Sequence, residues 1–250
     1  MKKNSKEYKL KLRLNRRLSQ GIKRYNLIAD GDHILLAISG GKDSLALAEL
    51  MAERSKIFKP KFTLSAVHVV MENISYETDL SYMKGFMADK EIPFYIRQTS
   101  FDASTDKRKS PCFLCSWSRR KELFEAAKEL GCNKIALGHH MDDILITLLM
   151  NMSFQGAIST MPPLMQMNKF NMQIIRPLCL IEEPDLIELS EMQGYKKQIK
   201  NCPYEKESFR AEITNLFKSL HKLNPEVRYS LWSSMTNIQK EMLPVEVKED

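Results

Sequence analysis

Six consecutive residues have the composition of a phosphate-binding loop: Ser39, Gly40, Gly41, Lys42, Asp43 and Ser44. They follow the apolar run 34–38 and precede apolar residues at helical spacing over 45–51, which predicts a buried strand, a tight turn and a helix. Glycines let backbone N–H groups approach a phosphate, and the helix start adds unpaired donors and the positive end of its dipole. The serine hydroxyls are further donors, and Asp43 can hold Mg²⁺ against the phosphates.

Two other phosphate-binding motifs do not fit this loop. A Walker A motif requires G-x-x-x-x-G-K-[ST], and the dinucleotide fingerprint requires G-x-G-x-x-G. An ordinary strand-to-helix turn with a serine cap is the simpler alternative, but it explains neither the paired glycines nor Asp43. We therefore interpret residues 39–44 as an anion cradle, with Lys42 and Asp43 as its candidate catalytic residues.

The cysteines form a second candidate site. The chain has 5 cysteines, an odd number that argues against a disulfide framework. Cys112 and Cys115 have the C-x-x-C spacing that suits zinc, an iron–sulfur cluster or a dithiol redox pair. Cys202 lies in a polar Asn-Cys-Pro turn, whereas Cys132 and Cys179 are typical of buried structural positions. With three thiolate ligands, an iron–sulfur cluster would have one iron with an open coordination position. A zinc ion with the same three ligands would be completed by water or histidine. The spacing alone does not join Cys202 to the pair.

Polar residues follow other predicted strands of the same sheet. His68 lies near the carboxyl end of the apolar run 62–70, where it could contact adenine or serve as a hydrogen-bonded strand-end histidine. Gly138 and His139 follow the run 134–137, which places them for phosphate or base contacts. Asp142 and Asp143 come next, either as helix-capping residues or as groups that orient Lys42, a base edge or a metal. Arg176 could pair with a phosphate of ATP or of RNA.

The order of these elements predicts an α/β fold, a doubly wound parallel sheet with helices on both faces. We expect strands at 34–38, 62–70, 94–98, 134–137 and 173–175, and helices at 78–90, 118–130, 144–152, 183–193, 209–223 and 226–242. Residues 160–172 suit either an adaptable surface or a β-hairpin at the sheet edge. The predicted domains are a basic N-terminal arm or helix over 1–24, a nucleotide-binding domain over 25–200, a helical extension over 201–244 and a frayed tail over 245–250.

Positive charge is concentrated at the N-terminus. Residues 1–24 carry ten Lys and Arg and one acid, Glu7, which gives this arm a charge of +9. The net charge of the whole chain is +7, so the remaining residues sum to −2. Such an arm fits nucleic acid, and a solvated basic tail is the alternative. Leu14, Leu18 and Ile22 recur every four residues, which predicts an amphipathic helix.

Four blocks together carry a family resemblance: SGGKDS at 39–44, PCFLC at 111–115 with Arg119 and Arg120 following, GHHMDD at 138–143, and MPP at 161–163 with IRPL at 175–178. The chain resembles the tRNA 2-thiocytidine synthetase (TtcA) family of the PP-loop ATP pyrophosphatase superfamily. The resemblance implies the adenine nucleotide alpha hydrolase-like fold, ATP and Mg²⁺ at 39–44, and a [4Fe–4S] cluster on Cys112, Cys115 and Cys202. Family members often carry a second C-x-x-C at the third position, where this chain has Cys202 alone.

The resemblance also implies a reaction and partners. The enzyme would adenylate the C2 oxygen of an anticodon-loop cytidine, the family target being position 32, and replace that oxygen with sulfur. Its partners would be tRNA and a sulfur donor, either a cysteine desulfurase or sulfide. Six cations could guide the tRNA backbone or form a solvated charged face: Lys107, Arg108, Lys109, Arg119, Arg120 and Lys121. We expect a cytoplasmic protein without a membrane segment, compatible with a homodimer. The alternatives are a PP-loop adenylating enzyme with another acceptor and a structural zinc, and a non-catalytic RNA-binding protein.

Overall fold

The computed structural model describes residues 5–57, 59–74, 76–77, 79–102, 104, 110–196, 199–200 and 209–244. The chain divides into two compact units, and each is considered by itself. The first comprises residues 1–141 and 162–208, and the second comprises residues 142–161 and 209–250. The domain boundaries predicted from the sequence stay a prediction.

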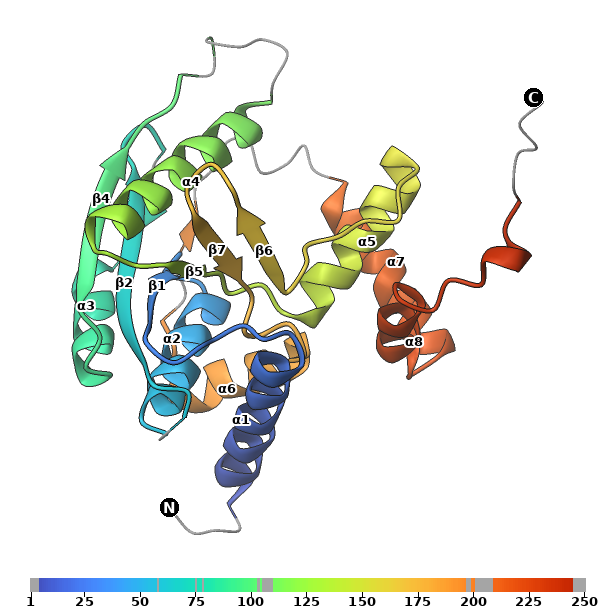
Figure 1. Cartoon of the computed structure of the whole chain (residues 1–250), viewed down its shortest axis with the longest axis horizontal. Coiled ribbons are helices and arrows are strands. Elements are labelled where there is room, and N and C mark those ends of the chain that lie inside the picture. The colour runs from blue at the N-terminus through green and yellow to red at the C-terminus, as the bar shows by residue number, and fades with distance from the viewer. Residues whose placement is uncertain are drawn as a thin grey trace. The chain divides into compact units, whose positions relative to one another are not determined.

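A six-stranded sheet forms the centre of the first unit (Figure 1). Its strands, in spatial order, are β4 (Phe94–Thr99), β2 (Phe62–Met71), β1 (Asp32–Ala37), β5 (Lys134–Ala136), β7 (Met172–Ile175) and β6 (Leu164–Met167). All neighbours are parallel except β6 and β7, which form an antiparallel hairpin at one edge. The predicted parallel α/β sheet is confirmed, and the hairpin decides between the two readings of residues 160–172. A separate two-stranded ladder pairs β3 (Tyr76–Glu77) with β8 (Ile199–Lys200).

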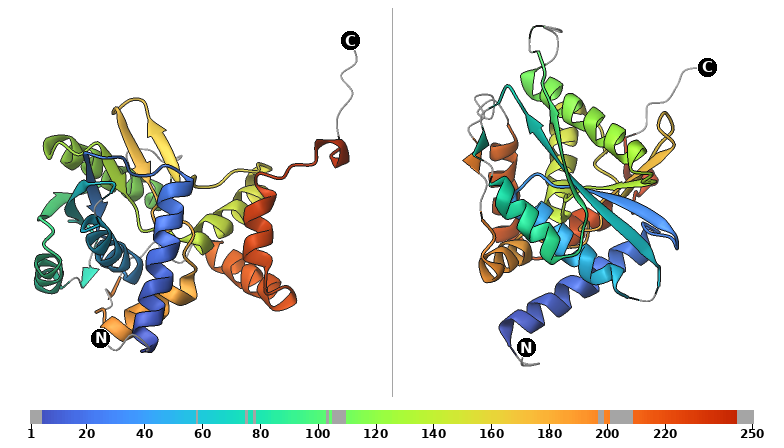
Figure 2. Two further views of the ribbon diagram at one scale, coloured as in Figure 1. Left: turned by 60° about the horizontal axis from the view of Figure 1, so that its bottom comes forward. Right: turned by 90° about the vertical axis from the view of Figure 1, so that its left-hand side faces the viewer.

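Both faces of the sheet are covered by helices, as predicted. Ile34 and Leu36 of β1 belong to one buried cluster and Leu35 to another, because successive strand side chains point to opposite faces. The first cluster includes buried residues from α1 (Lys6–Arg24), α2 (Lys42–Ser55), α3 (Leu80–Asp89) and α6 (Glu183–Gln193). The second is built on α4 (Pro111–Glu129), which lies on the other side of the sheet from α3 (Figure 2).

The basic N-terminal segment is a helix over its described length. Leu10, Leu14, Leu18 and Ile22 are buried, which confirms the predicted amphipathic pattern and extends it by one turn. Several of its cations pair with acids of neighbouring helices: Lys11 Nζ lies 2.9 Å from Glu49 of α2, Arg13 lies 2.7 Å from Asp185 of α6, and Lys6 lies 2.8 Å from Glu188. Part of the charge that suggested RNA binding thus holds α1 against the domain.

Two predicted helix boundaries are wrong by more than one helical turn. We expected a helix from residue 118, but α4 begins at Pro111, where the Ser110 side chain accepts a hydrogen bond from the Phe113 N–H at 3.2 Å. Proline at the first helical position is favourable, since its missing N–H would have no partner there. We also expected a helix over 226–242, whereas α8 covers Val227–Ser234 and a short 3₁₀ helix covers Lys240–Met242. At the end of α8 the Ser234 hydroxyl donates to the Leu231 carbonyl and the Thr236 hydroxyl donates to the Ser233 carbonyl, and these bonds compete with helical hydrogen bonding.

The second unit is helical in its described part. It contains α5 (Met141–Gln155) from Asp142 onward, α7 (Arg210–Leu223) and α8. The rings of Phe154 and Phe209 stack with centroids 5.2 Å apart, and the Arg228 guanidinium lies 5.5 Å from the Phe217 ring centroid. Among the described helices of the whole chain, none has both the length and the apolar content needed to cross a membrane.

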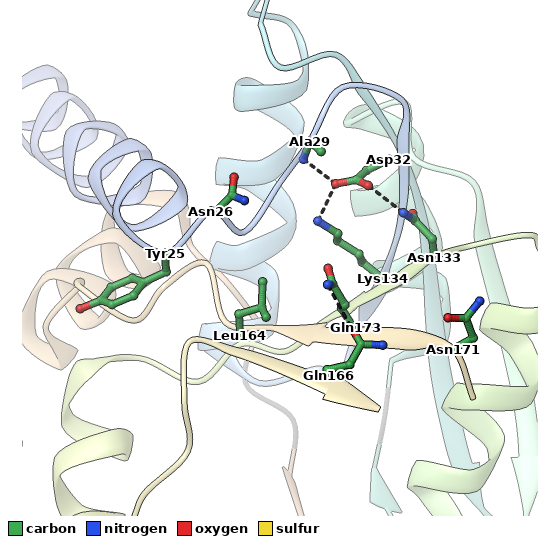
Figure 3. A pocket seen from close by; sticks show the side chains of 10 residues that line it. All are labelled: Tyr25, Asn26, Ala29, Asp32, Asn133, Lys134, Leu164, Gln166, Asn171 and Gln173. Atoms are coloured by element: carbon green, nitrogen blue, oxygen red, sulfur yellow. Dashed lines mark hydrogen bonds and ion pairs between the residues drawn. The ribbon is translucent and has the colours of Figure 1, made fainter. Parts of the chain in front are cut away.

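A buried ion pair joins the amino ends of the two central strands. Lys134 of β5 and Asp32 of β1 are 6% and 5% exposed, and Lys134 Nζ lies 2.8 Å from Asp32 Oδ2. Burial alone would raise the pKa of Asp32, but hydrogen bonds from Lys134, the Ala29 N–H and Asn133 outweigh it and hold that pKa below its ordinary value. The pair forms one wall of a pocket of about 540 Å³ that opens at this amino edge (Figure 3).

Replacing Lys134 with methionine should destabilise the protein by about 3–5 kcal/mol, because it leaves the Asp32 carboxylate buried without its countercharge. Equilibrium chemical unfolding measures this change. Lys56→Met is the matched control, since Lys56 pairs with Glu91 at 64% and 76% side-chain exposure and should cost at most about 1 kcal/mol. Equal losses in the two variants would contradict the importance assigned to the buried pair.

Candidate active site

The predicted phosphate loop lies between β1 and α2, at the carboxyl edge of the sheet. Helix α2 begins at Lys42 with Gly41 as its N-cap residue. Gly40 has a φ of +85°, a left-handed conformation that favours glycine. The Ser39 hydroxyl accepts from the Gly41 N–H at 3.3 Å and donates to the Ser44 hydroxyl at 3.2 Å, which in turn donates to the Gly41 carbonyl at 2.8 Å. These hydrogen bonds join the two ends of the loop, which is followed directly by the N-terminus of α2.

Charged side chains surround the start of α2. Lys42 Nζ lies 2.9 and 3.1 Å from the two Asp43 carboxylate oxygens and 3.3 Å from Glu183 Oε1, and His140 Nε2 lies 3.9 Å from Asp43 Oδ1. Burial would lower the pKa of Lys42, but Asp43 and Glu183 outweigh it and raise that pKa above its ordinary value. Lys42 is therefore a charged ammonium that can attract a polyphosphate.

Gly138 follows β5 and lies where the carboxyl end of that strand approaches the phosphate loop. A Cβ atom at Gly138 would lie 3.2 Å from the Asp43 carbonyl carbon and oxygen and 3.2 Å from the Ser44 nitrogen. These are backbone atoms, so a larger residue could be accommodated only by moving the loop or the strand. β1 and β5 are adjacent in a sheet whose strand order reverses between them, which is the position where open α/β sheets bind ligands.

His68 lies within β2 and is 5% exposed. Its Nδ1 lies 2.7 Å from the Ile38 carbonyl oxygen. Burial lowers the pKa of His68 despite this hydrogen bond, and the nearby Arg119 charge lowers it further, so the ring is neutral near pH 7. Because a carbonyl can only accept, the proton must be on Nδ1, and Nε2 is left as an acceptor. The structure thus shows the hydrogen-bonded strand histidine that the sequence offered as one alternative.

Arg176 and His139 meet at the ends of β7 and β5. Arg176 is 5% exposed; its Nη1 donates to the Pro162 carbonyl at 2.5 Å and its Nε to His139 Nδ1 at 3.3 Å. Burial, followed by the charge of Arg120, lowers the pKa of Arg176 to about 10, so it stays cationic near neutral pH. These contacts hold the guanidinium at the carboxyl edge.

Helix α4 carries the C-x-x-C pair on its first turns. Cys112 is exposed and Cys115 half-buried, and residues three apart on a helix lie on one face. Because α4 follows the carboxyl end of β4 and leads to the amino end of β5, its N-terminus belongs to the edge where the phosphate loop lies. The helix packs against β2, β4 and β5 of the sheet.

Asp142 and Asp143 have a role that the sequence did not suggest. Within the second unit, Asp142 is 2% exposed and accepts from Arg228 Nε and Nη2, both at 2.8 Å. Asp143 accepts from Arg210 Nη2 at 2.5 Å. The two carboxylates therefore tie α5 to α8 and α7. Their predicted catalytic role stays a prediction.

Some predicted site residues lie outside the described residues: Cys202, Lys107, Arg108 and Lys109. Within the ranges that the structure does describe, no three or more His, Cys, Asp and Glu side chains are grouped to hold a metal ion. The described part of the predicted cluster site is thus the pair Cys112 and Cys115.

Glu183 is a site residue that the sequence analysis missed. It is the first residue of α6, and the sequence analysis placed it only as the start of a helix over 183–193. Its contact with Lys42 spans 141 positions, so no local pattern could have found it. The sequence signal available for Glu183 was an acidic residue at the start of a helix that follows a core strand.

Comparison with known proteins agrees with this geometry. The PP-loop domain family matches residues 10–213. A tRNA-cytidine(32) 2-sulfurtransferase of Acinetobacter baumannii is 32% identical, over 96% of this chain and 81% of the relative. One of Vibrio vulnificus is 33% identical, over 92% and 75%. Among solved structures, the U34-tRNA thiolase NcsA from Methanococcus maripaludis with its [4Fe-4S] cluster matches with a TM-score of 0.74 and 27% identity, over 97% of this chain and 82% of that one.

The sheet, its loop and the family match define a PP-loop enzyme of the ATP pyrophosphatase type. Within that class, the chain belongs to the tRNA 2-thiocytidine synthetase family of tRNA sulfurtransferases. The resemblance stated from the four sequence blocks is thereby confirmed, and the relatives support ATP-dependent tRNA thiolation.

Gly138→Ala should disturb the phosphate loop, because the added Cβ would meet loop backbone at 3.2 Å. We expect a loss of about 1–3 kcal/mol in unfolding free energy and weaker ATP binding, measured by chemical unfolding and by titration calorimetry. Gly85→Ala in α3 is the matched control. Its Cβ would meet nothing within 4 Å, and alanine should stabilise a helix interior by about 1 kcal/mol or less. Wild-type ATP affinity in Gly138→Ala would show that the close approach is not needed.

Proposed function

We propose that the protein converts a cytidine in the anticodon loop of tRNA, at position 32, to 2-thiocytidine at the expense of ATP. The observation that carries this proposal is the presence, in one compact unit, of the phosphate loop and of the C-x-x-C helix at the same sheet edge. Relatives named tRNA-cytidine(32) 2-sulfurtransferase support the choice of base and position.

The phosphate loop is proposed to hold ATP. Backbone donors at the start of α2 and the Lys42 ammonium would receive the polyphosphate, since both carry positive charge toward the loop. His68 Nε2, an acceptor in the neutral ring, suits the exocyclic amine of adenine. The buried cation Arg176, with His139 beside it, would bind a phosphate of ATP or of tRNA.

The reaction divides into two displacements. The C2 carbonyl of cytidine is a poor electrophile, and its oxygen is a poor leaving group. In the first displacement this oxygen bonds to the α-phosphorus of ATP while the bond to the bridging oxygen breaks, and pyrophosphate leaves. In the second, sulfur at the oxidation level of sulfide bonds to C2 while the C2–O bond breaks, and AMP leaves. Lys42 and the loop N–H groups would stabilise the charge that develops on pyrophosphate.

Asp43 is the proposed Mg²⁺ ligand, because a carboxylate and phosphate oxygens are the donors that this ion prefers. Its carboxylate lies 2.9 Å from the Lys42 ammonium and 3.9 Å from the His140 ring. A divalent cation there would neutralise the departing pyrophosphate further.

Cys112 and Cys115 fit an iron–sulfur cluster as far as the described residues extend. They are thiol side chains on one face of a helix N-terminus, which favours anionic ligands, and one of them is exposed to the exterior. We propose Cys202 as the third ligand. When bound by three cysteines, such a cluster supplies an iron with an open coordination position that can hold sulfide. The cluster of the NcsA thiolase supports this choice over zinc.

The remaining proposals concern the cellular setting. The second displacement consumes sulfur at the oxidation level of sulfide. That sulfur would come from free sulfide, or from the persulfide of a cysteine desulfurase together with a two-electron reductant. The protein would act in the cytoplasm on tRNA, and a homodimer is compatible with these roles. Arg119 and Arg120 would attract the tRNA backbone near the site.

Asp43→Ala should abolish 2-thiocytidine formation, because the loop would lose its acidic group beside Lys42. Nucleoside mass spectrometry of tRNA from a deletion strain carrying each variant measures the product. Asp89→Ala, at the exposed end of α3, should restore the wild-type level. If deletion leaves the thionucleoside profile unchanged, the proposed function is wrong; if Asp43→Ala restores it, the loop chemistry is wrong.

Cysteine replacements test the cluster separately. Cys112→Ser, Cys115→Ser and Cys202→Ser should each lose most of the iron and visible absorption of anaerobically purified protein. Cys132→Ala is the control and should keep both, because that thiol is buried in the core and burial raises its pKa to about 11. Metal analysis that finds zinc without iron in the wild type would instead support an adenylating enzyme with a structural zinc.

A further inference from the structure

Helix α1 is held on both flanks by polar contacts with its neighbours, α2 and α6 (Figure 1). On the flank toward α2, Lys11 Nζ lies 2.9 Å from Glu49, and the Asn15 amide donates to Glu53 at 2.7 Å. On the other flank, three cations pair with acids of α6 and its N-cap: Lys6 with Glu188 at 2.8 Å, Arg13 with Asp185 at 2.7 Å and Arg17 with Glu182 at 3.9 Å. The buried leucine stripe lies between these flanks.

The remaining side of α1 carries a row of three cations: Lys9, Arg16 and Lys23. They are seven residues apart, which at 3.6 residues per turn places them in one line along the helix, opposite the buried stripe. All three are exposed. Among the residues that the structure describes, no acid lies within 4.0 Å of any of them as an ion-pair partner. Docking of the helix thus accounts for its flank cations but not for this outer row.

The middle of α1 lies close to the active site. Arg17, which follows Arg16 in the chain, pairs with Glu182 at the start of α6. The next residue, Glu183, lies 3.3 Å from the Lys42 ammonium of the phosphate loop. Two ion pairs and one peptide bond therefore connect α1 to the loop, so a large substrate that reaches the loop can also contact the outer row.

The length and charge of the outer row suit a nucleic acid backbone. At 1.5 Å per residue, Lys9 and Lys23 are about 21 Å apart along the helix, which exceeds the length of one triphosphate and fits a series of phosphates. Beside Arg16 lies a hollow of about 380 Å³ whose lining contains no acid: Arg13, Arg16, Arg17 and Gln20.

An anionic membrane fits this helix less well. A helix that binds a membrane surface inserts its apolar face between the lipids. In α1 that face is Leu10, Leu14, Leu18 and Ile22, each at most 5% exposed because it packs in the domain core. The outer side therefore offers cations with only Leu12 exposed among its large apolar residues.

We propose that the outer row of Lys9, Arg16 and Lys23 binds the phosphate backbone of tRNA outside the loop that enters the active site. The proposal rests on the proposed function, and it adds a surface that positions the substrate. Phosphate contacts fix the register and orientation of a nucleic acid without reading its sequence. The outer row would thus hold the tRNA, while groups at the phosphate loop select and activate the base.

The salt dependence of RNA binding tests this surface. We expect the triple variant Lys9→Gln, Arg16→Gln, Lys23→Gln to bind unmodified tRNA at least about tenfold more weakly at about 0.1 M salt. The plot of log affinity against log salt concentration should become shallower by about two to three, since each lost phosphate contact removes about 0.7–0.9. The same fold-loss should occur with a tRNA that carries uridine in place of the target cytidine, because the contacts are independent of the base.

Two control variants separate the outer row from charge in general. Lys9→Arg, Arg16→Lys, Lys23→Arg keeps the charges and should keep the affinity within about threefold and the wild-type salt slope. Lys56→Gln, Lys84→Gln, Lys128→Gln removes the same number of exposed cations from α3 and from positions at the ends of α2 and α4. This variant should lower the slope by less than one. An equal effect of the two glutamine triples, or wild-type binding by the outer-row triple, would overturn the proposal.

The reaction itself distinguishes a positioning role from a wider defect. The outer-row triple should raise the KM for tRNA, with the KM for ATP and the unfolding midpoint unchanged. A raised KM for ATP with unchanged tRNA binding would show that these cations serve the nucleotide, and the proposal would be wrong. Binding of the wild type to vesicles of phosphatidylserine and phosphatidylcholine, without binding to tRNA, would identify a membrane surface instead.

Failure of the outer row and failure of the proposed function give different results. If the outer-row triple binds tRNA like the wild type while deletion of the gene removes 2-thiocytidine, the row fails and the function stands. If deletion leaves 2-thiocytidine unchanged while the outer-row triple loses tRNA affinity, the thiolation proposal fails and the RNA surface stands.

Discussion

The site depends on the close approach of two strand ends at the centre of the sheet. The turn after β5 passes so near the start of α2 that a Cβ at Gly138 would lie in tight contact with backbone atoms of Asp43 and Ser44, 3.2 Å away. β1 and β5 are hydrogen-bonded neighbours, and the buried Asp32–Lys134 pair fixes their other ends. The phosphate loop and the turn after β5 therefore lie at one end of a strand pair whose other end is fixed by the ion pair.

Two buried or half-buried cations near this contact are held in different ways. Lys42 is held charged by Asp43 and Glu183, and Arg176 is held by a carbonyl and a histidine nitrogen instead of a carboxylate. A guanidinium paired with neutral acceptors keeps its net charge available for an anion. The arrangement suits a substrate that brings many negative charges, as a nucleoside triphosphate does.

Different side chains of the long helices α1 and α4 have different roles. Helix α4 anchors itself with Phe124 in the sheet cluster and carries its cysteines and exposed aromatics at the opposite end. Helix α1 buries a leucine stripe and pairs Lys11 and Arg13 with acids of α2 and α6. Each of these helices therefore combines a buried apolar stripe with exposed or charged side chains.

The sequence by itself determined the sheet, the phosphate loop and the C-x-x-C pair, because strand periodicity, glycine pairs and cysteine spacing are local patterns. It also identified the family from four short blocks. Tertiary structure alone decided that Glu183 meets Lys42 across 141 positions and that Asp142 and Asp143 bind Arg228 and Arg210. Those outcomes depend on which side chains packing brings together, and long-range contacts leave no periodic signal in a single chain.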